Sequence, residues 1–285
     1  MSYWSEIERH TDWEQSWMSH PAVRARINRL VTGDPLRWPI MELRTLVPDR
    51  VPFENALSIG CGVGNFERTL VELDLVKRVT GLDASARAVE AARAASALAG
   101  TVSRIDYVTA DARDFLARRG AFDAVFFHQS LHHFVALPNL LGLVRRALLP
   151  RGILYLEEYV GPSRTEWSWR HLLRWNAVYW GLPRGVRRAR VVRSPVNRDD
   201  PTEAVESSGI LRAIDSHFRV LARRDYGGNL IAVIYPNLLR PSQPGGPSPA
   251  AFGEVIQALL AREDAVLRRE PGFHTVIAAE PRPIS

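Results

Sequence analysis

The chain has 285 residues, 46% of them hydrophobic and 24% charged, which is the usual balance of a globular protein with one large core or two small ones. The net charge of +6 comes almost wholly from arginine, because Lys77 is the only lysine, so it indicates compositional bias more than nucleic-acid binding. A single cysteine, Cys61, excludes an internal disulfide, and no apolar run is long enough to cross a bilayer. The acidic, aromatic N-terminus does not resemble a secretory signal, so we expect a cytoplasmic protein.

The first fifty residues differ in pattern from the rest of the chain. Trp4, Trp13, Trp17 and Trp38 are scattered among polar residues, and the sequence Gly-Asp-Pro at 33–35 indicates a turn. We expect two or three amphipathic helices here, outside the main sheet.

From residue 55 onward, short apolar runs alternate with segments of helical periodicity. The expected strands are 56–59, 79–82, 105–109, 122–127 and 153–157, and the expected helices are 65–73, 85–98, 112–118 and 138–149. Ser85 is a good N-cap and Gly100 a good helix terminator, and the Pro-Arg-Gly sequence at 150–152 should stop the fourth helix. This alternation predicts an α/β protein with a doubly wound, mostly parallel sheet.

After the fifth strand the alternation is interrupted. Residues 161–183 are rich in tryptophan and arginine and predict an inserted helix, and a second helix is expected to start at Asp200, ahead of Pro201. Two last strands are expected at 218–223 and 275–279, separated by a short loop at 241–249 and a helix near 252–269. The arginine-rich stretch 182–198 is interpreted as a solvated face, with a basic binding patch as the alternative.

Three glycines lie at alternate positions directly after the first strand. Gly60, Gly62 and Gly64 would expose main-chain amides at the start of a helix, where a polar or anionic ligand is favoured. The G-x-G-x-x-G spacing of a dinucleotide site is not met, because Asn65 is not a glycine. Asp83 ends the second strand, where a carboxylate can accept both ribose hydroxyls, and Asp111 ends the third.

Together these segments resemble the successive motifs of class I S-adenosylmethionine-dependent methyltransferases. The resemblance is carried by ALSIGCGVGNFER, VTGLDAS, YVTADARDF, FDAVFFHQSLHHF and RRALLPRGILYLEEYV, within residues 55–160. It implies a seven-stranded Rossmann-like sheet with an antiparallel last strand and S-adenosyl-L-methionine as the cofactor. It further implies a cofactor site formed by Ser58, Gly60, Cys61, Gly62, Gly64, Asp83, Ala84, Asp111, Ala112, His128 and Gln129.

The resemblance also implies a division of the chain. Residues 1–50 are expected to form an N-terminal helical lid and residues 51–285 the methyltransferase domain, with 161–205 as a helical insertion that caps the acceptor. Ser58 departs from the family pattern, since many members carry an acid there. Glu67, in the first turns of the next helix, is a candidate substitute, and a solvent-facing Glu67 is the alternative.

The candidate catalytic residues follow the fourth and fifth strands. His133 and His132 are candidate bases, because a histidine with a pKa near neutrality can deprotonate a phenol, an alcohol or an ammonium. Glu157 and Glu158 should lie on opposite faces of their strand, so at most one meets the acceptor or an arginine above it; the alternative is that this carboxylate pairs with Arg164 or Arg170. We expect Glu157 to be the catalytic one, and we expect no metal site.

The expected function is methylation of an oxygen or nitrogen of a small molecule, in natural-product or glycan tailoring. Aromatic residues of the insertion, with arginines at the rim, would suit a flat or acidic acceptor. Two alternatives stay open: the same cofactor used for non-methyl chemistry such as cyclisation or elimination, and a non-catalytic partner subunit. Nucleic acid and membranes are not expected partners, and a homodimer is left open.

Overall fold

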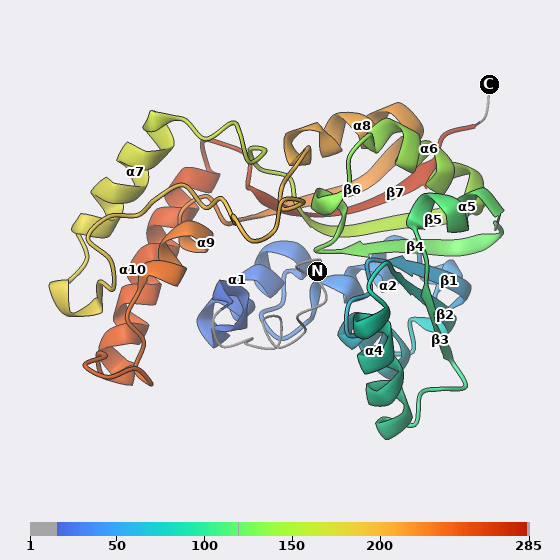
Figure 1. Cartoon of the computed structure of the whole chain (residues 1–285), viewed down its shortest axis with the longest axis horizontal. Coiled ribbons are helices and arrows are strands. Elements are labelled where there is room, and N and C mark those ends of the chain that lie inside the picture. Colours follow the sequence, from blue (N-terminus) through green and yellow to red (C-terminus); the bar gives the residue numbers. More distant parts are fainter. Residues whose placement is uncertain (1–15, 119, 284–285) are drawn as a thin grey trace.

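A computed structural model describes residues 16–118 and 120–283. In these ranges the chain forms one seven-stranded sheet with helices on both faces (Figure 1). The predicted helical segment around Trp4 and Trp13 lies outside the described residues. No helix in the described ranges combines the length and the apolar character needed to span a bilayer.

The order of the strands confirms the predicted sheet. From one edge to the other it is β3 (Ile105–Thr109), β2 (Val76–Asp83), β1 (Phe53–Ile59), β4 (Phe122–His128), β5 (Leu148–Tyr159), β7 (His274–Pro281) and β6 (Phe218–Gly227). The first five are parallel, and β7 is antiparallel to both of its neighbours. Because the strand order reverses between β1 and β4, their carboxyl ends border the crevice where such sheets bind ligands.

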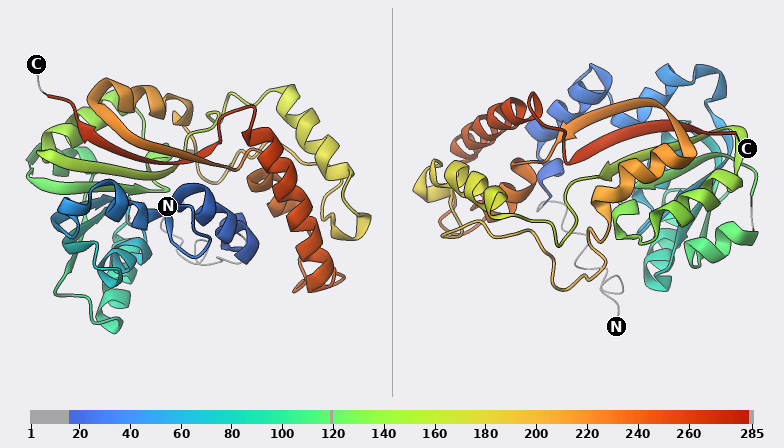
Figure 2. Two further views of the ribbon diagram at one scale, coloured as in Figure 1. Left: turned by 180° about the vertical axis from the view of Figure 1, so that it is seen from behind. Right: turned by 90° about the horizontal axis from the view of Figure 1, so that it is seen from above.

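Helices cover the two faces of the sheet and one of its ends. The helices on one face are α1 (Pro21–Thr32), α2 (Leu43–Leu46), α3 (Asn65–Glu72) and α4 (Ala86–Leu98), and those on the other are α5 (Ala112–Arg118), α6 (Leu137–Ala147) and α8 (Ile210–His217). The remaining helices, α7 (Trp169–Trp180), α9 (Ile231–Ile234) and α10 (Pro249–Leu267), lie together beyond one end of the sheet (Figure 2, left).

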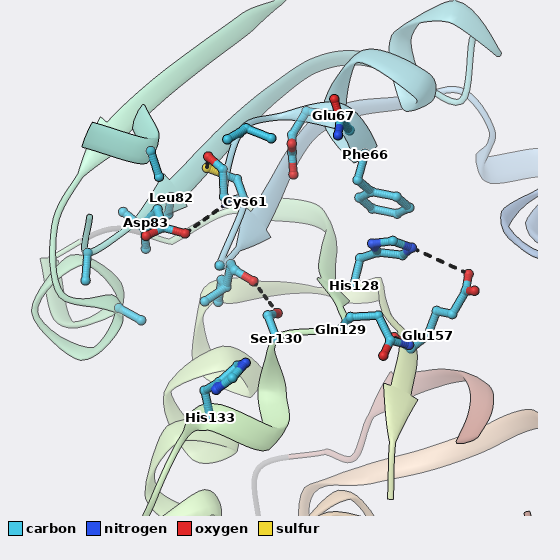
Figure 3. Close-up of a pocket in the computed structure, with 18 of the residues that line it drawn as sticks. Cys61, Phe66, Glu67, Leu82, Asp83, His128, Gln129, Ser130, His133 and Glu157 are labelled. Atoms are coloured by element: carbon cyan, nitrogen blue, oxygen red, sulfur yellow. Dashed lines mark hydrogen bonds and ion pairs between the residues drawn. The ribbon is translucent and has the colours of Figure 1, made fainter. Parts of the chain in front are cut away.

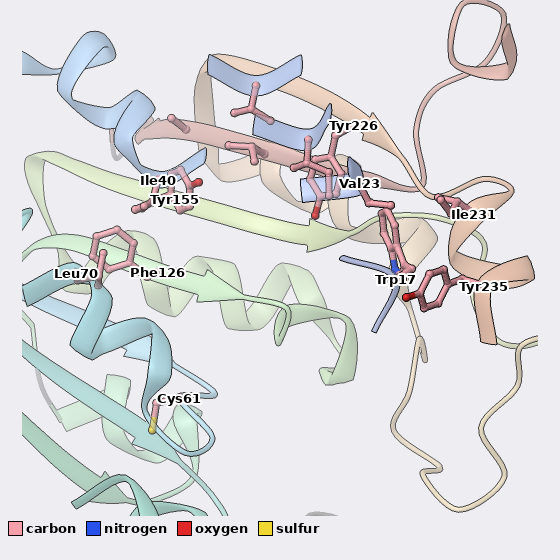
Figure 4. Packing of buried hydrophobic residues seen from close by; sticks show 14 of the residues in the cluster. Trp17, Val23, Ile40, Cys61, Leu70, Phe126, Tyr155, Tyr226, Ile231 and Tyr235 are labelled. Carbon is pink, nitrogen blue, oxygen red and sulfur yellow. The ribbon is translucent and has the colours of Figure 1, made fainter. Parts of the chain in front are cut away.

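Alternation along the central strands builds a core on each face. Phe126 and Tyr155 point to the face of α1 and α3, whereas the next residues, Phe127 and Leu156, point to the face of α5 and α6. The Phe126 ring lies 5.8 Å from Phe66 of α3 and 6.1 Å from Tyr155 (Figure 4). Burial of each such ring stabilises the folded chain by roughly 1.5–3 kcal/mol. These contacts fix α3, and with it the glycine turn, on the sheet.

Buried polar side chains hold two further segments near the carboxyl ends of the strands. Arg26 of α1 donates to Tyr226 O and to Asp264 Oδ1, both at 2.7 Å, which ties α1 to β6 and α10. Glu263 of α10 is fully buried and accepts the main-chain amides of Asn229, Leu230 and Ile231 at 2.8–2.9 Å. As a result, the segment before α1 and the turn after β6 have defined places beside the crevice.

Most predicted elements are present; several strands extend a few residues beyond their predicted ends, and two further boundaries are wrong for a structural reason. The helix predicted over 138–149 ends at Ala147, because β5 already begins at Leu148 and continues through the Pro-Arg-Gly sequence. An irregular register between β4 and β5 accommodates Pro150, which has no amide to donate.

The second wrong boundary is the helix predicted to start at Asp200. Asp200 Oδ1 accepts the Thr202 amide at 2.9 Å and the Thr202 hydroxyl at 2.6 Å, which closes a tight turn instead of a helix. Helix α8 begins only at Ile210.

Candidate active site

The glycine turn after β1 requires glycine at two positions for steric reasons. Gly60 has φ +74°, and a Cβ there would lie 2.5 Å from the Ser130 Cβ; Gly64 has φ +76°, and its Cβ would lie 2.3 Å from the Tyr107 hydroxyl. Gly62 also has a positive φ, but nothing lies within 4 Å of its Cβ position. The turn is therefore packed tightly from behind and leaves main chain uncovered in front.

A cavity of about 550 Å³ lies in front of this turn, at the carboxyl ends of β1 to β4 (Figure 3). The predicted site residues that line it are Gly60, Cys61, Gly62, Asp83, Ala84, Asp111, Ala112, His128, Gln129, His133 and Glu157. Met18 and Arg24 close it from the N-terminal side. Ser58, Gly64 and His132 do not line this cavity. Its volume is in the ordinary range for small-molecule and cofactor sites, about 300–1,000 Å³.

Two aspartates at successive strand ends face the cavity with part of their hydrogen-bonding capacity in use. Asp83 Oδ2 accepts the Gly62 amide at 2.9 Å, and Asp83 Oδ1 accepts the Ser85 amide at 2.8 Å. Asp111 Oδ1 caps α5 by accepting the Arg113 amide at 2.7 Å. Each carboxylate oxygen has more than one lone pair, so both residues can also accept from a ligand.

Glu67 is buried beside the glycine turn, not exposed to solvent. Ser58 Oγ donates to Glu67 Oε1, while Glu67 Oε2 has no hydrogen-bond partner in the described part of the chain. Burial raises the pKa of Glu67 from 4.5 to about 7, a shift that the Ser58 hydrogen bond opposes. Glu67 itself lines the cavity, so α3 places a carboxyl group directly beside Ser58.

His128 and Glu157 lie at the side of the cavity nearest α3. The His128 ring stacks on Phe66 with centroids 4.5 Å apart and planes 8° from parallel, and His128 Nε2 is 3.9 Å from Glu157 Oε2. The next residue, Gln129, has φ +53° and donates its side-chain amide to Glu157 O at 3.1 Å and Tyr226 Oη at 3.2 Å. Gln129 is thereby fixed as a wall of the cavity.

Glu157 and Glu158 point to opposite faces, as their alternation predicts. The alternative of a pairing with Arg164 or Arg170 is not met, because in the described residues both glutamates have histidine partners and Arg164 donates to carbonyls. Glu158 is fully buried, is hydrogen-bonded to His132 Nδ1, and accepts the Ser130 and Leu131 amides at 2.9 and 2.6 Å. Although burial alone would lower the pKa of His132, Glu158 and then Glu203 raise it to about 10. His132 is therefore an imidazolium at neutral pH.

His133 differs from its neighbour in charge and in surroundings. Its Nδ1 is 3.1 Å from Thr202 Oγ1 and 3.5 Å from Asp200 Oδ2. Burial, followed by repulsion from His132, lowers the pKa of His133 to about 4. His133 is thus a neutral imidazole on the wall of the first cavity.

A second cavity of about 240 Å³ adjoins the first, and both are lined by Met18 and Gln129. Its aromatic wall consists of Trp17, Tyr159, Trp167 and Phe273, and its polar wall includes His132, Arg164, Glu203 and His274. Of the aromatic residues predicted in the insertion, Trp167 lines this cavity, Trp175 and Tyr179 are buried, and Trp169 and Trp180 are exposed. Phe66, Glu203 and His274 gave no local sequence signal, because their partners are far away along the chain.

Comparisons with known proteins agree with this geometry. Residues 57–156 match the family model described as "Methyltransferase domain". Among solved structures, geranyl diphosphate C-methyltransferase from Streptomyces coelicolor A3(2) is 14% identical, with 88% of this chain and 82% of that chain covered and a TM-score of 0.52. The [4+2]-cyclase SpnF is 18% identical, with 95% and 97% covered and a TM-score of 0.50.

These matches agree with the predicted resemblance. Residues 57–156 match a methyltransferase domain, and the sheet that contains them has the Rossmann-like methyltransferase fold, so the predicted fold is confirmed. The domain match and a structural neighbour solved with S-adenosyl-L-homocysteine support S-adenosylmethionine as the cofactor.

Proposed function

We propose that this chain transfers the methyl group of S-adenosylmethionine to an oxygen or nitrogen of a small, ring-bearing molecule, in natural-product or glycan tailoring. The observation that carries the proposal is the pair of adjoining cavities. One contains the glycine turn with its carboxylates, the other is aromatic, and Met18 and Gln129 border both.

The residues of the first cavity fit the cofactor. Glu67 Oε2 is a buried carboxylate oxygen without a partner in the described ranges, and it suits the ammonium of the cofactor's methionine end. The open space in front of Gly62 leaves room for the cofactor's own carboxylate, Asp83 suits the ribose hydroxyls, and Asp111 suits the amino group of the adenine.

When bound, the cofactor would supply a methyl group carried on a positively charged sulfur. The acceptor's nucleophile would attack the methyl carbon in line, with the sulfur as the leaving group. The protein has to hold the nucleophile behind that methyl group, exclude water and accept a proton. His133 and Glu157 reach the first cavity and are the side chains proposed to accept the proton. His132 reaches the second cavity as an imidazolium, so its proposed role is to orient the acceptor.

The second cavity is the proposed acceptor site. A cavity of about 150 Å³ holds one benzene ring, so 240 Å³ accommodates one or two rings. The walls formed by Tyr159, Trp167 and Phe273 favour a flat molecule, and Arg164 and Glu203 can orient its polar substituents.

The fold by itself does not decide the reaction, since the structure of a [4+2]-cyclase, SpnF, is similar to it. Product analysis does separate them. Purified protein incubated with S-adenosylmethionine and a panel of phenols, amines and sugar derivatives is expected to release S-adenosylhomocysteine together with a methylated acceptor. Methylthioadenosine would instead indicate attack at another carbon, and an acceptor converted without cofactor consumption would indicate a bystander role.

The acceptor site has its own test in a pair of tryptophan variants. Trp167→Ala should raise the acceptor KM at least tenfold, because it removes one wall of the second cavity. Trp169→Ala, whose side chain is exposed on the same segment, should leave KM unchanged. Cofactor binding without turnover on any acceptor would favour the non-catalytic partner subunit.

A further inference from the structure

His132, His133 and Glu203 meet at the boundary between the two cavities. One donor atom from each of these side chains lies within 4.8 Å of the other two. His132 Nε2 is 3.6 Å from Glu203 Oε1, and His133 Nε2 is 3.8 Å from Glu203 Oε2. The first cavity is lined by His133, and the second by His132 and Glu203.

We propose that this cluster is a binding site for a first-row divalent cation, with His132 Nε2, His133 Nε2 and the Glu203 carboxylate as ligands. Two tetrahedral ligands at about 2.1 Å from Zn²⁺ are about 3.4 Å apart, and the two histidine–glutamate distances of 3.6 and 3.8 Å are close to this separation. Two imidazoles and a carboxylate are a donor set that suits zinc, iron or nickel, and not magnesium or calcium.

The groups behind the two imidazoles are those that a metal site needs. A metal-bound histidine almost always gives its other ring nitrogen to a carboxylate, a carbonyl or water. His132 Nδ1 is hydrogen-bonded to Glu158, which main-chain amides fix in place. His133 Nδ1 is hydrogen-bonded to Thr202 Oγ1 at 3.1 Å, and the Thr202 hydroxyl donates to Asp200 Oδ1 at 2.6 Å. Both imidazoles are therefore oriented with Nε2 toward Glu203.

Asp200 gives an independent indication of a missing positive charge. Its side chain is fully buried, and Oδ2 has no hydrogen-bond partner in the described part of the chain. The nearby Arg164 donates to the main-chain carbonyls of Asp200 and Asn197. Within the described ranges, it makes no hydrogen bond to the carboxylates of Glu158, Asp200 or Glu203. Three carboxylates, those of Glu158, Asp200 and Glu203, thus lie around the two imidazoles, and a divalent cation held by the imidazoles would offset their negative charge.

The consequence for the acceptor rests on the proposed function, whereas the site itself does not. A cation with three protein ligands keeps coordination positions for an oxygen of the acceptor. An ion here also occupies both histidine lone pairs, which leaves Glu157 to accept the acceptor's proton.

Titration of the whole, chelator-treated protein with Zn²⁺ in a calorimeter tests the site. We expect one ion per chain, at least tenfold weaker binding in Glu203→Gln and in His133→Asn, and no comparable binding of Mg²⁺. Glu206→Gln, a carboxylate change three residues from Glu203, is the matched control and should bind as the parent does. Circular dichroism of each variant verifies that it is folded.

Two results would overturn the proposal: no saturable Zn²⁺ binding by the parent protein, or equal affinity in the parent and in folded Glu203→Gln. Neither result bears on methyl transfer, which product analysis with S-adenosylmethionine decides. Conversely, Zn²⁺ binding that is lost in Glu203→Gln supports the site even where no acceptor is turned over.

Discussion

The buried carboxyl group of Glu67 lies next to Ser58, the position at which the sequence has no acid. Its Oε1 accepts from Ser58, its Oε2 has no hydrogen-bond partner in the described ranges, and the residue lines the cavity beside the glycine turn. An ionised, unpaired oxygen in such a place is costly for the empty protein. The same oxygen is an unusually favourable partner for a bound ammonium group.

Glu67→Gln should therefore make the unliganded protein more stable and at the same time weaken its binding of the cofactor. Folding raises the pKa of Glu67 from 4.5 to about 7. The contribution of Glu67 to the free energy of unfolding is therefore fully present below about pH 4.5 and is lost as the pH rises through 7. Above that pH, the free energy of unfolding of the unliganded protein is lower by about 3 kcal/mol.

Chemical denaturation at pH 5 and pH 8 measures this effect. The variant should be more stable than the parent at pH 8 and should show less dependence on pH, while calorimetry shows at least tenfold weaker binding of S-adenosylmethionine. Equal pH dependence in parent and variant would contradict the raised pKa.

Asp83 tests the other end of the proposed cofactor site. Asp83→Ala removes the acceptor for ribose hydroxyls and also the anchors of the Gly62 and Ser85 amides. We expect cofactor affinity to fall more than tenfold. Asp106→Ala, an exposed change on β3, is the control and should bind normally. Unchanged affinity in Asp83→Ala would remove the ribose assignment.

At the scale of elements, α10 has a role that its sequence did not indicate. Its buried Glu263 accepts three successive amides of the turn after β6, and a Cβ at Gly227 would lie 2.6 Å from its carboxylate. Gly228 begins this turn, and Ala232 and Val233 follow it; all three residues line the second cavity. A single side chain thus connects a distant helix to the proposed acceptor site.

Glu263→Gln replaces one carboxylate oxygen with an amide group that faces main-chain N–H donors. Leaving a buried donor unsatisfied costs about 1–3 kcal/mol, so the denaturation midpoint should fall and the acceptor KM should rise. Glu254→Gln, at an exposed position of the same helix, should change neither. A midpoint identical to that of the parent would show that the turn is held by other contacts.

Local signals in the sequence were enough for most elements. Ser85 accepts from the Ala88 amide as an N-cap, Gly100 has φ +68°, and the strand at 105–109 and the helix at 112–118 have the predicted bounds. The Asp-Pro signal at residue 200 failed because the same side-chain oxygen can cap a helix or close an isolated turn.

The side-chain contacts within the candidate site were harder to predict from the sequence than the elements. The glycine turn and the strand-end aspartates could be predicted because motif and strand end lie within a few residues of each other. The burial of Glu67, the pairing of Glu158 with His132 and the approach of Glu203 to both histidines depend on how the chain folds back. Their partners lie as far as 71 residues away along the chain, beyond the range of periodicity and capping rules.

At the scale of the whole molecule, the first cavity is assembled from segments spread over much of the chain. Met18 and Arg24 precede the sheet, the glycine turn and the aspartates follow its first three strands, and Thr202 comes from beyond β5. A ligand bound there contacts all of these segments at once. Its binding energy is therefore expected to stabilise the chain as one unit.

Calorimetric melting with and without S-adenosylhomocysteine tests this expectation. At a ligand concentration of 100 times Kd, mass action adds about 2.7 kcal/mol, so Tm should rise by several degrees in a single transition. Two transitions, with only the earlier or the later one shifted, would show that α7, α9 and α10 unfold separately from the cavity.

The position of the single thiol has a practical consequence. Cys61 lies in the glycine turn with 9% of its surface exposed, and burial followed by the charge of Glu67 raises its pKa, so the reactive thiolate is scarce. A colorimetric disulfide reagent should therefore modify the native chain slowly, and more slowly still with ligand present. Cysteines introduced on the surface could then be labelled selectively with a dye, with no need to replace the natural one.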